Sequence, residues 1–274
     1  MKRTKAPNTT GMATLLCDFK PNRCDSAVYM NRKLDVTEFV KYIKDLKKEH
    51  ENVTFFHGLV FLLGKTLYSR PKMNYYVQDR HIFTHDDVSI SFVAKEKFED
   101  DSVELLTVVK IPEDSTVLDI SEFVYNQVKK IRSANHGGLD NFVDKIGHLP
   151  NIIRVPLIGI LKYMDRKGCL PKSLIADNLY YSSAIVSNLG TFKTGAIYHN
   201  LTNFGTASSL ITFGEIVEEG NKYYMEIGAT IDERIADGFY FVKALKLLEY
   251  MFKHPEVLME PASKHVDIPE SEKK

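Results

Sequence analysis

The chain has 274 residues, of which 44% are hydrophobic and 26% charged, and these values exclude a disordered chain and allow one large core. Lysines and arginines number 36, as do aspartates and glutamates, so the formal net charge is zero at pH 7. The chain therefore has no net electrostatic field to attract anionic partners, and no segment interleaves basic and aromatic residues. The sequence thus does not support binding of nucleic acid or of an anionic membrane.

The first part of the chain predicts a strand and two helices. Residues 25–32 are expected to form a strand. Residues 34–50 predict an amphipathic helix of about 14 residues, because apolar residues recur every three or four positions. The next helix, within residues 53–70, is apolar on most of its circumference and is expected to be buried on nearly all sides. Pro71 ends it.

The middle of the chain predicts a hairpin, two strands and three helices. Residues 75–85 predict a hairpin whose turn is Asp79–Arg80, and strands are expected at residues 88–98 and 103–111. The helices follow at residues 119–133, 139–147 and 151–168, the last one bent by Pro156.

The last third is mainly strand. Residues 183–192, 208–219 and 222–232 form three β-rich runs, and Glu219-Gly220-Asn221 predicts a hairpin turn between the last two. An amphipathic helix over residues 238–255 completes the pattern. Because strands and helices are mixed without a regular βαβ alternation, and no repeat or linker is visible, the sequence predicts one α+β domain with a mixed sheet.

The cysteines and the N-terminal residues indicate the cellular compartment. Cys17, Cys24 and Cys169 are too few and too widely spaced for a disulfide framework, and they lack the paired spacing of a zinc site, so no metal is expected. The chain has no apolar run of 18 residues, and the opening MKRTKAPNTTGM lacks the apolar stretch of a signal peptide. We therefore expect a cytoplasmic protein that does not bind a membrane.

Several common catalytic motifs are missing from the sequence. It contains neither of the glycine-rich phosphate loops, no G-x-S-x-G elbow and no H-E-x-x-H pair. Kinase, hydrolase and metalloprotease activities therefore lack their usual signatures.

Two segments are informative together, IVSNLGTF at 185–192 and IDERIADGF at 231–239. In this order, about 46 residues apart, they resemble the catalytic domain shared by chloramphenicol acetyltransferase and the dihydrolipoyl acyltransferases of 2-oxoacid dehydrogenase complexes. In that family the first segment often reads S-N-L-G, and the second reads D-H-R-x-x-D-G or H-H-x-x-x-D-G. The helices, hairpin and strand upstream also resemble the family's elements.

This resemblance implies an α+β fold of the chloramphenicol acetyltransferase type, a two-layer sandwich with a mixed β-sheet and helices packed on one face. It divides the chain into an N-terminal segment (1–24), an acyltransferase-like catalytic domain (25–258) and a flexible tail (259–274). It also implies a homotrimer with sites at the subunit interfaces. Because the first 24 residues are too few for a lipoyl domain, the expected acyl carrier is CoA as a co-substrate. The acceptor is expected to be a small molecule.

The resemblance assigns roles to individual residues. Ser187 matches the serine that stabilises the tetrahedral oxyanion of acyl transfer, and Asn188 follows it in the motif. Arg234 matches the arginine after the general base. Asp237 matches an aspartate that is mostly architectural and pairs with an arginine, and Gly238 matches the glycine that lets the strand enter the helix.

The general base departs from the family, because Glu233 stands where the family has histidine. An imidazole has a reference pKa near 6.5, whereas a glutamate carboxyl has one of about 4.3, far below that of a thiol. A carboxylate is therefore a poor base unless burial raises its pKa by about 2 to 3 units. Three alternatives remain open: Glu233 is the base, another group is the base, or the chain is an inactive homologue that serves as a trimeric binding or assembly protein.

Other candidates have plainer interpretations. His199, in GAIYHNLTNFG between the two motif strands, lies where a loop could bring it to the site, but a loop histidine bonded to backbone or solvent is the simpler alternative. His57 is expected to be a core histidine in an apolar helix, and His136 a loop residue. For Ser187 the site role is favoured over that of a strand-end serine bonded to backbone.

Overall fold

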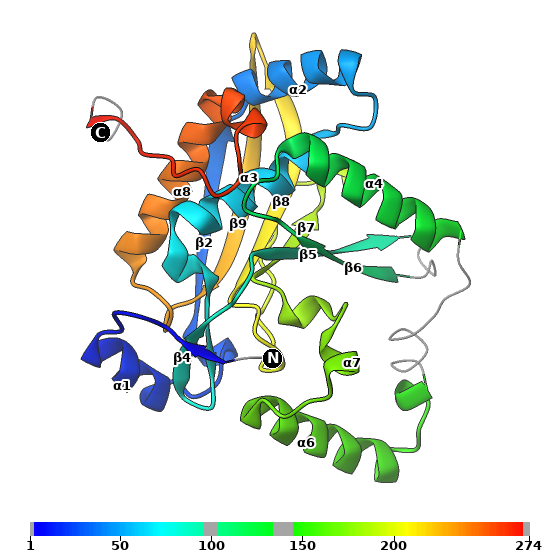
Figure 1. The fold of residues 1–274 in the computed structure, drawn as a ribbon, viewed down its shortest axis with the longest axis vertical. Coiled ribbons are helices and arrows are strands. Elements are labelled where there is room, and N and C mark those ends of the chain that lie inside the picture. The colour runs from blue at the N-terminus through cyan, green and yellow to red at the C-terminus, as the bar shows by residue number, and fades with distance from the viewer. Residues whose placement is uncertain (1–2, 96–103, 134–144, 271–274) are drawn as a thin grey trace.

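The computed structural model describes residues 3–95, 104–133 and 145–270 (Figure 1). Its centre is a six-stranded sheet in the order β2-β9-β8-β7-β5-β6, in which β7 runs parallel to β5 and β8 and the other pairs are antiparallel. The strands are β2 (Ala27–Asp35), β5 (Ser89–Lys95), β6 (Glu104–Lys110), β7 (Ala184–Asn188), β8 (Ser209–Glu219) and β9 (Lys222–Asp232). A smaller sheet joins β1 (Thr4–Lys5), β4 (His81–Thr84) and β3 (Tyr75–Gln78) in that order.

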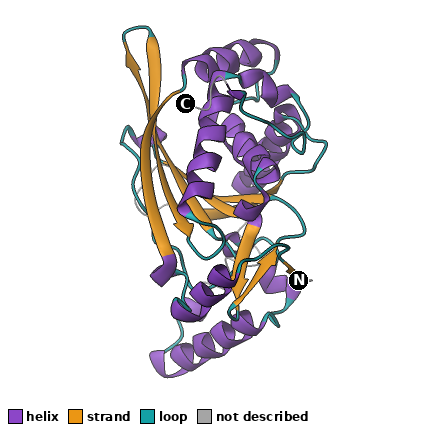
Figure 2. Ribbon diagram, turned by 90° about the vertical axis from the view of Figure 1, so that its left-hand side faces the viewer, coloured by secondary structure: helices purple, strands orange, loops and turns teal. Residues whose placement is uncertain are grey.

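The helices lie mainly on one face of the large sheet (Figure 2). The α-helices are α1 (Gly11–Phe19), α2 (Thr37–Glu49), α3 (Phe55–Ser69), α4 (Val117–Ser133), α6 (Asn151–Lys167), α7 (Lys172–Ile175) and α8 (Gly238–Lys253). Single 3-10 turns lie at Cys24–Ser26, Pro71–Asn74, Leu179–Tyr181, Gly190–Phe192 and Pro255–Met259.

The main core lies between the sheet and helices α2, α3, α4 and α8. Phe39, Phe61 and Phe252 from the helices meet Ile90 and Phe213 from the strands, and all five side chains are buried. Burial of aromatic and branched side chains of this kind is the main favourable contribution to folding. The predicted two-layer α+β sandwich, with a mixed sheet and helices on one face, is therefore confirmed.

Most of the predicted elements are found close to their expected limits. The helix expected within 53–70 is α3, which is buried on almost every side and ends before Pro71. The turn at Asp79–Arg80 is confirmed, and both residues take positive φ angles of 49° and 64°, as the favoured two-residue hairpin turn requires. Gly220, with φ 64°, turns the β8–β9 hairpin as expected.

The first strand differs from its prediction. It runs over Ala27–Asp35 and not over 25–32, because Ser26 N–H donates a 3.2 Å hydrogen bond to Arg23 O and closes a 3-10 turn there. At its other end, β2 stays paired with β9 as far as Asp35 opposite Tyr224. The helix predicted at 139–147 falls mostly outside the described residues.

Segments near both ends of the described chain pack against the body. Ala6 N–H donates to Ile82 O at 3.1 Å, and Ala262 is fully buried with its N–H bonded to Ser115 O at 2.9 Å. The domain limits at residues 24 and 258 remain predictions. In the described part of the chain, no helix combines the length and apolar character needed to cross a membrane.

The outer face of the large sheet, turned away from these helices, is partly covered by the loop 193–206. A Cβ added at Gly214 would lie 2.8 Å from Ala196 N, and one added at Gly228 would lie 2.9 Å from Ile197 O. The absence of a side chain at these two glycines therefore lets the loop backbone lie directly on the strands. Tyr198 on the loop packs edge-on against Tyr29 of β2, with ring centroids 5.5 Å apart.

Candidate functional site

Ser187 lies near the carboxyl end of β7, in the middle of the large sheet. Ala184 and Val186 pack into the helical core, whereas Ile185 belongs to a small apolar cluster on the outer face, the face that Ser187 shares by strand alternation. A cavity of about 720 Å³ opens there, and Ser187 lines it. Small-molecule sites commonly occupy about 300 to 1,000 Å³, so this cavity has the size of a substrate site.

His199 lines the same cavity, from the loop that crosses the outer face. Its Nε2 atom is buried, and no hydrogen-bond partner for it lies among the described residues. A buried polar atom without a partner costs about 1 to 3 kcal/mol, so this nitrogen is a hydrogen-bonding group that the described fold leaves unused. Most of the lining around these two polar groups is apolar, including Val93, Leu106, Ile158, Leu161 and Leu210.

The His199 ring and the Ser187 hydroxyl are groups that can take part in acyl-transfer chemistry. An imidazole nitrogen is able to accept a proton and return it near neutral pH, and a hydroxyl is able to donate a hydrogen bond to a developing oxyanion. An apolar lining strengthens both interactions once a bound molecule has displaced the water from it.

Asn188 serves the turn that follows Ser187. Its Oδ1 accepts a 3.1 Å hydrogen bond from Gly190 N–H, which holds the short 3-10 turn at the end of β7. The contact fixes the direction in which the chain leaves the strand.

Glu233 lies just after β9 and is engaged in an ion pair. Its Oε2 is 2.6 Å from Lys20 Nζ, and the two side chains are 36% and 38% exposed. Its N–H donates to Ser26 O at 2.9 Å, which continues the pairing of β9 with the segment ahead of β2. In one chain, therefore, Glu233 has a cationic partner and lacks the burial that a carboxylate base needs.

Ser187 and Glu233 are well separated within one chain. Ser187 is level with Thr212 on β8, and Thr212 is level with Gly228 on β9. Glu233 follows Gly228 by five residues, which at about 3.3 Å per residue places it about 16 Å further along the strand direction. Glu233 is not part of the lining of the Ser187 cavity. A site that used both residues would need two chains.

Arg234 is buried, and all three nitrogens of its guanidinium group donate hydrogen bonds. Its Nε and Nη2 donate to the two carboxylate oxygens of Asp232 at 2.8 and 2.7 Å, and its Nη1 donates to the carbonyls of Lys20 and Pro21, both at 3.0 Å. Arg234 therefore fastens the N-terminal segment to the end of β9. Sequence reasoning missed Asp232, although its place two residues before the arginine of the motif was a usable signal.

Asp237 is the N-cap of α8. Its Oδ1 accepts a 2.8 Å hydrogen bond from Tyr240 N–H, which satisfies one of the free donors of the first helical turn. The ion pair with an arginine that the resemblance implied is not found among the described residues, where Arg234 pairs with Asp232. Gly238 begins the helix, and a Cβ there would meet no atom within 4 Å.

Two other histidines are buried in structural roles. His57 Nδ1 lies 2.8 Å from Ser121 Oγ, which confirms it as a core histidine. His85, which sequence reasoning missed, bonds to Asn74 O at 3.1 Å and to Thr206 Oγ1 at 3.0 Å. Loss of water on burial lowers the pKa of each histidine to about 4. His136 lies outside the described residues.

A search for metal ligands among the described residues finds no group of three or more histidine, cysteine, aspartate or glutamate side chains that could hold an ion.

The fold is similar to that of several solved structures. A probable dihydrolipoamide acetyltransferase from Listeria monocytogenes 4b F2365 is 15% identical, with a TM-score of 0.59 over 91% of this chain and 94% of that one. A truncated catalytic core of the 2-oxoacid dehydrogenase multienzyme complex from Thermoplasma acidophilum is 16% identical, with a TM-score of 0.59 over 92% and 99%. A chloramphenicol acetyltransferase is 12% identical, with a TM-score of 0.61 over 92% and 100%.

Comparisons with protein-family models and with curated proteins give no match. At these low identities the structural similarity shows the fold alone, and it covers nearly the whole chain. The resemblance first suggested by the two motifs is confirmed at that level: this chain has the fold that chloramphenicol acetyltransferase shares with the acyltransferase cores of 2-oxoacid dehydrogenase complexes.

Proposed function

We propose that this protein is a CoA-dependent acyltransferase that moves an acyl group between CoA and a small acceptor, with a group other than the motif histidine as general base. The observation that carries the proposal is the cavity of about 720 Å³ that Ser187 and His199 line together. The names of the similar structures, which include acetyltransferases, support CoA as the co-substrate. The mainly apolar lining favours an apolar acyl group or acceptor.

In this mechanism Nε2 of His199 accepts the proton of an acceptor hydroxyl, and the hydroxyl oxygen attacks the carbonyl carbon of the thioester. The Ser187 hydroxyl donates a hydrogen bond to the oxyanion that forms. When the carbonyl re-forms, the carbon–sulfur bond breaks and the imidazolium returns the proton to the sulfur of CoA. The products are an ester and free CoA thiol. Nε2 accepts a proton only in the tautomer that carries its hydrogen on Nδ1.

Glu233 takes a structural part in this proposal. Its ion pair with Lys20 links the N-terminal segment to the end of β9, where Arg234 makes its own bonds to the same segment. The homotrimer that the resemblance implies remains part of the proposal, as does a cytoplasmic location. In a trimer, Glu233 of a neighbouring chain is the rival candidate for the base.

A binding or assembly protein without catalysis is the second candidate. The observation in its favour is that Glu233, in the position of the family's base, is paired with Lys20 and far from Ser187 of the same chain. A chain that kept the scaffold and lost the base would still need its buried motif residues for folding.

The test is an assay of thiol release from acetyl-CoA and from longer, apolar acyl-CoA molecules with a panel of hydroxyl and amine acceptors. We expect turnover by the natural protein, a loss of about 10²- to 10³-fold in Ser187→Ala and a loss of about 10²- to 10⁴-fold in His199→Gln. Glu233→Gln is expected to keep turnover within a few-fold.

Two results would contradict this assignment. Loss of turnover in Glu233→Gln with full turnover in His199→Gln would make Glu233 the base. No turnover with any acceptor, together with no thermal shift on adding CoA, would leave the binding or assembly protein as the better description.

A further inference from the structure

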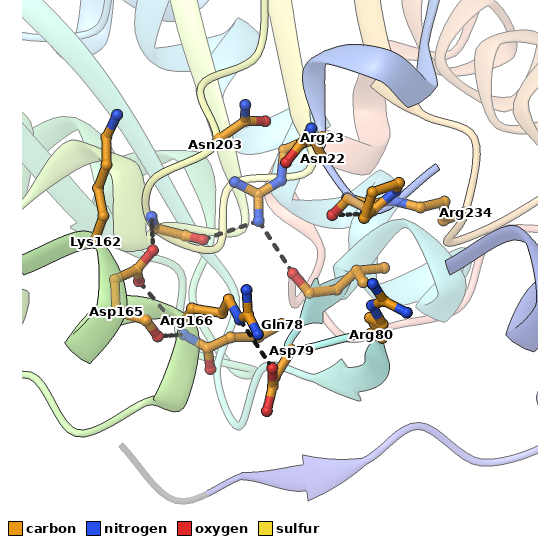
Figure 3. A pocket seen from close by; sticks show the side chains of 13 residues that line it. Asn22, Arg23, Gln78, Asp79, Arg80, Lys162, Asp165, Arg166, Asn203 and Arg234 are labelled. Atoms are coloured by element: carbon orange, nitrogen blue, oxygen red, sulfur yellow. Dashed lines mark hydrogen bonds and ion pairs between the residues drawn. The ribbon is translucent and has the colours of Figure 1, made fainter. Parts of the chain in front are cut away.

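A second cavity, of about 280 Å³, lies between the N-terminal segment, the β3–β4 turn and α6 (Figure 3). This volume is far above the roughly 10 to 15 Å³ that a cavity needs to hold one water molecule, so a small ion fits inside. Unlike the Ser187 cavity, it is lined mainly by polar side chains. Its cationic side chains are Arg23, Arg80, Lys162, Arg166 and Arg234.

Arg23 lies at the centre of this cavity in Figure 3 and is only 4% exposed. Its Nη1 and Nη2 donate to the carbonyls of Thr202 and Gly205, both at 2.8 Å. Its Nε lies 3.7 Å from Asp232, whose two oxygens already accept the paired hydrogen bonds of Arg234. Two buried guanidinium groups therefore share this carboxylate.

Asp165 is the other buried carboxylate here. It accepts hydrogen bonds from the Tyr181 hydroxyl at 2.5 Å and from Gly205 N–H at 3.1 Å. Burial raises the pKa of Asp165, and the Tyr181 hydroxyl is the largest of the contacts that oppose this rise. With Asp165 and Asp232 both ionised, the two buried arginines are balanced in charge, and any protonation of Asp165 adds to the positive charge of the cavity.

The more exposed charged residues around this cavity, together called its rim, carry an excess of positive charge. Asp79 is held by Arg166 at 3.1 Å and by Lys167 at 2.8 Å, so that one carboxylate faces two cations. Arg80 pairs with Asp18 at 3.3 Å and is 58% exposed. For Lys162, which is also exposed, no carboxylate partner lies among the described residues. In Figure 3 the Lys162 and Arg80 side chains stand on opposite sides of Arg23.

Together, the lining and the side chains paired with it hold six cations and four carboxylates. An excess of two positive charges around a small polar cavity suits a dianion, and both guanidinium and ammonium groups bind phosphate oxygens through charge-assisted hydrogen bonds. We propose that this cavity binds a phosphate group, either as inorganic phosphate or as the end of a phosphate monoester. The proposal stands apart from acyl transfer, since neither Ser187 nor His199 lines this cavity.

The experiment is a titration of the natural chain with inorganic phosphate, followed by calorimetry and by thermal unfolding, against sodium chloride at matched ionic strength. We expect a saturable signal and a rise in Tm, because a ligand that binds only the folded state stabilises it. Lys162→Gln and Arg80→Gln are each expected to raise the Kd at least fivefold. The matched control is Lys48→Gln, which removes one positive charge from the exposed surface of α2 and is expected to leave the Kd unchanged.

A parallel titration with glycerol 3-phosphate distinguishes the two sources. Tighter binding than inorganic phosphate identifies a monoester, weaker binding identifies the free ion, and each result supports the site. Two results would overturn the proposal. One is that neither compound gives a saturable signal. The other is that the natural chain, Lys162→Gln and Arg80→Gln have equal Kd values. Activity is not the readout, so failure of the proposed acyl transfer leaves this test intact.

Discussion

At the scale of single residues, the acyltransferase motif divides into side chains with firm structural partners and side chains that face the cavity. Arg234 binds Asp232 through two short hydrogen bonds in a buried setting, and removal of either partner of such a pair typically costs about 3 to 5 kcal/mol. Folding alone therefore explains why this arginine is present. Ser187 is different, because its hydroxyl makes no hydrogen bond with the described residues, and it lines a cavity.

The buried histidines predict a pH dependence of stability. Burial holds the pKa of His85 and of His57 at about 4, below the value near 6.5 expected in the unfolded chain. Between these values the unfolded chain binds more protons, so their contribution is present above about pH 6.5 and is lost as the pH falls toward 4. We expect the free energy of unfolding, measured in urea, to fall by up to about 3 kcal/mol per histidine between pH 7 and 4.

Two histidines four positions apart, His85 and His81, provide a test variant and its control. His85→Gln removes one buried titrating group, so the fall in stability with acid is expected to be shallower. His81→Gln changes an exposed histidine on β4 and is expected to keep the slope of the natural chain. Equal slopes in the natural protein and His85→Gln would show that His85 does not contribute.

At the scale of elements, Asp237 offers a direct test of whether a motif residue caps a helix or does chemistry. Asp237→Ala is expected to lower the free energy of unfolding by about 1 kcal/mol, because Tyr240 N–H loses its acceptor. Asp237→Asn keeps an equivalent cap and is expected to cost a few tenths of a kcal/mol, with turnover unchanged. Urea unfolding and the thiol-release assay measure the two effects. Loss of turnover in a stable Asp237→Asn protein would assign the carboxylate to catalysis.

The elements themselves were largely predictable from local pattern. The apolar circumference of α3 and the alternation in β8 and β9 each lie in one continuous stretch, so periodicity was enough to find them. The first strand was displaced because its start depends on Ser26, which bonds to Asp232 across 206 positions of sequence at 2.8 Å. Local pattern carries no information about such a contact.

The candidate site was predictable in part. The motif resemblance led to Ser187, and His199 was a candidate because its loop lies between the two motif strands, although a loop histidine bonded to backbone or solvent was the simpler alternative. The structural reason is the close approach of the loop to the sheet at Gly214 and Gly228, which depends on the folded register of β8 and β9. The ion pair of Glu233 with Lys20 joins residues 213 positions apart and had no signal in either segment.

At the scale of the whole molecule, one chain leaves many apolar side chains exposed. On α6, Ile152 is 84% exposed, Val155 64% and Tyr163 62%, and on the outer face Tyr29 and Tyr198 are nearly half exposed. Exposed apolar surface of this kind favours association. It is consistent with the proposed homotrimer, for which light scattering is expected to give three times the chain mass of 31.3 kDa.

Mixing of variant chains tests whether the proposed site lies within one subunit. Because Ser187 and His199 line one cavity of one chain, a mixture of Ser187→Ala and His199→Gln proteins, unfolded together and refolded, is expected to stay as inactive as its parts. If the two residues instead acted across an interface, random mixing would restore both in about one interface in four, and turnover would return.

The same experiment with Ser187→Ala and Glu233→Gln separates the rival base. Under the proposal, Glu233→Gln is active by itself, and mixing with Ser187→Ala only dilutes that activity. Under the rival, each protein is inactive alone and the mixture recovers, because the intact Glu233 of one chain meets the intact Ser187 of its neighbour. Such recovery would move the base from His199 to Glu233, and it would also explain how two motif residues about 16 Å apart along the strands of one chain form a single site.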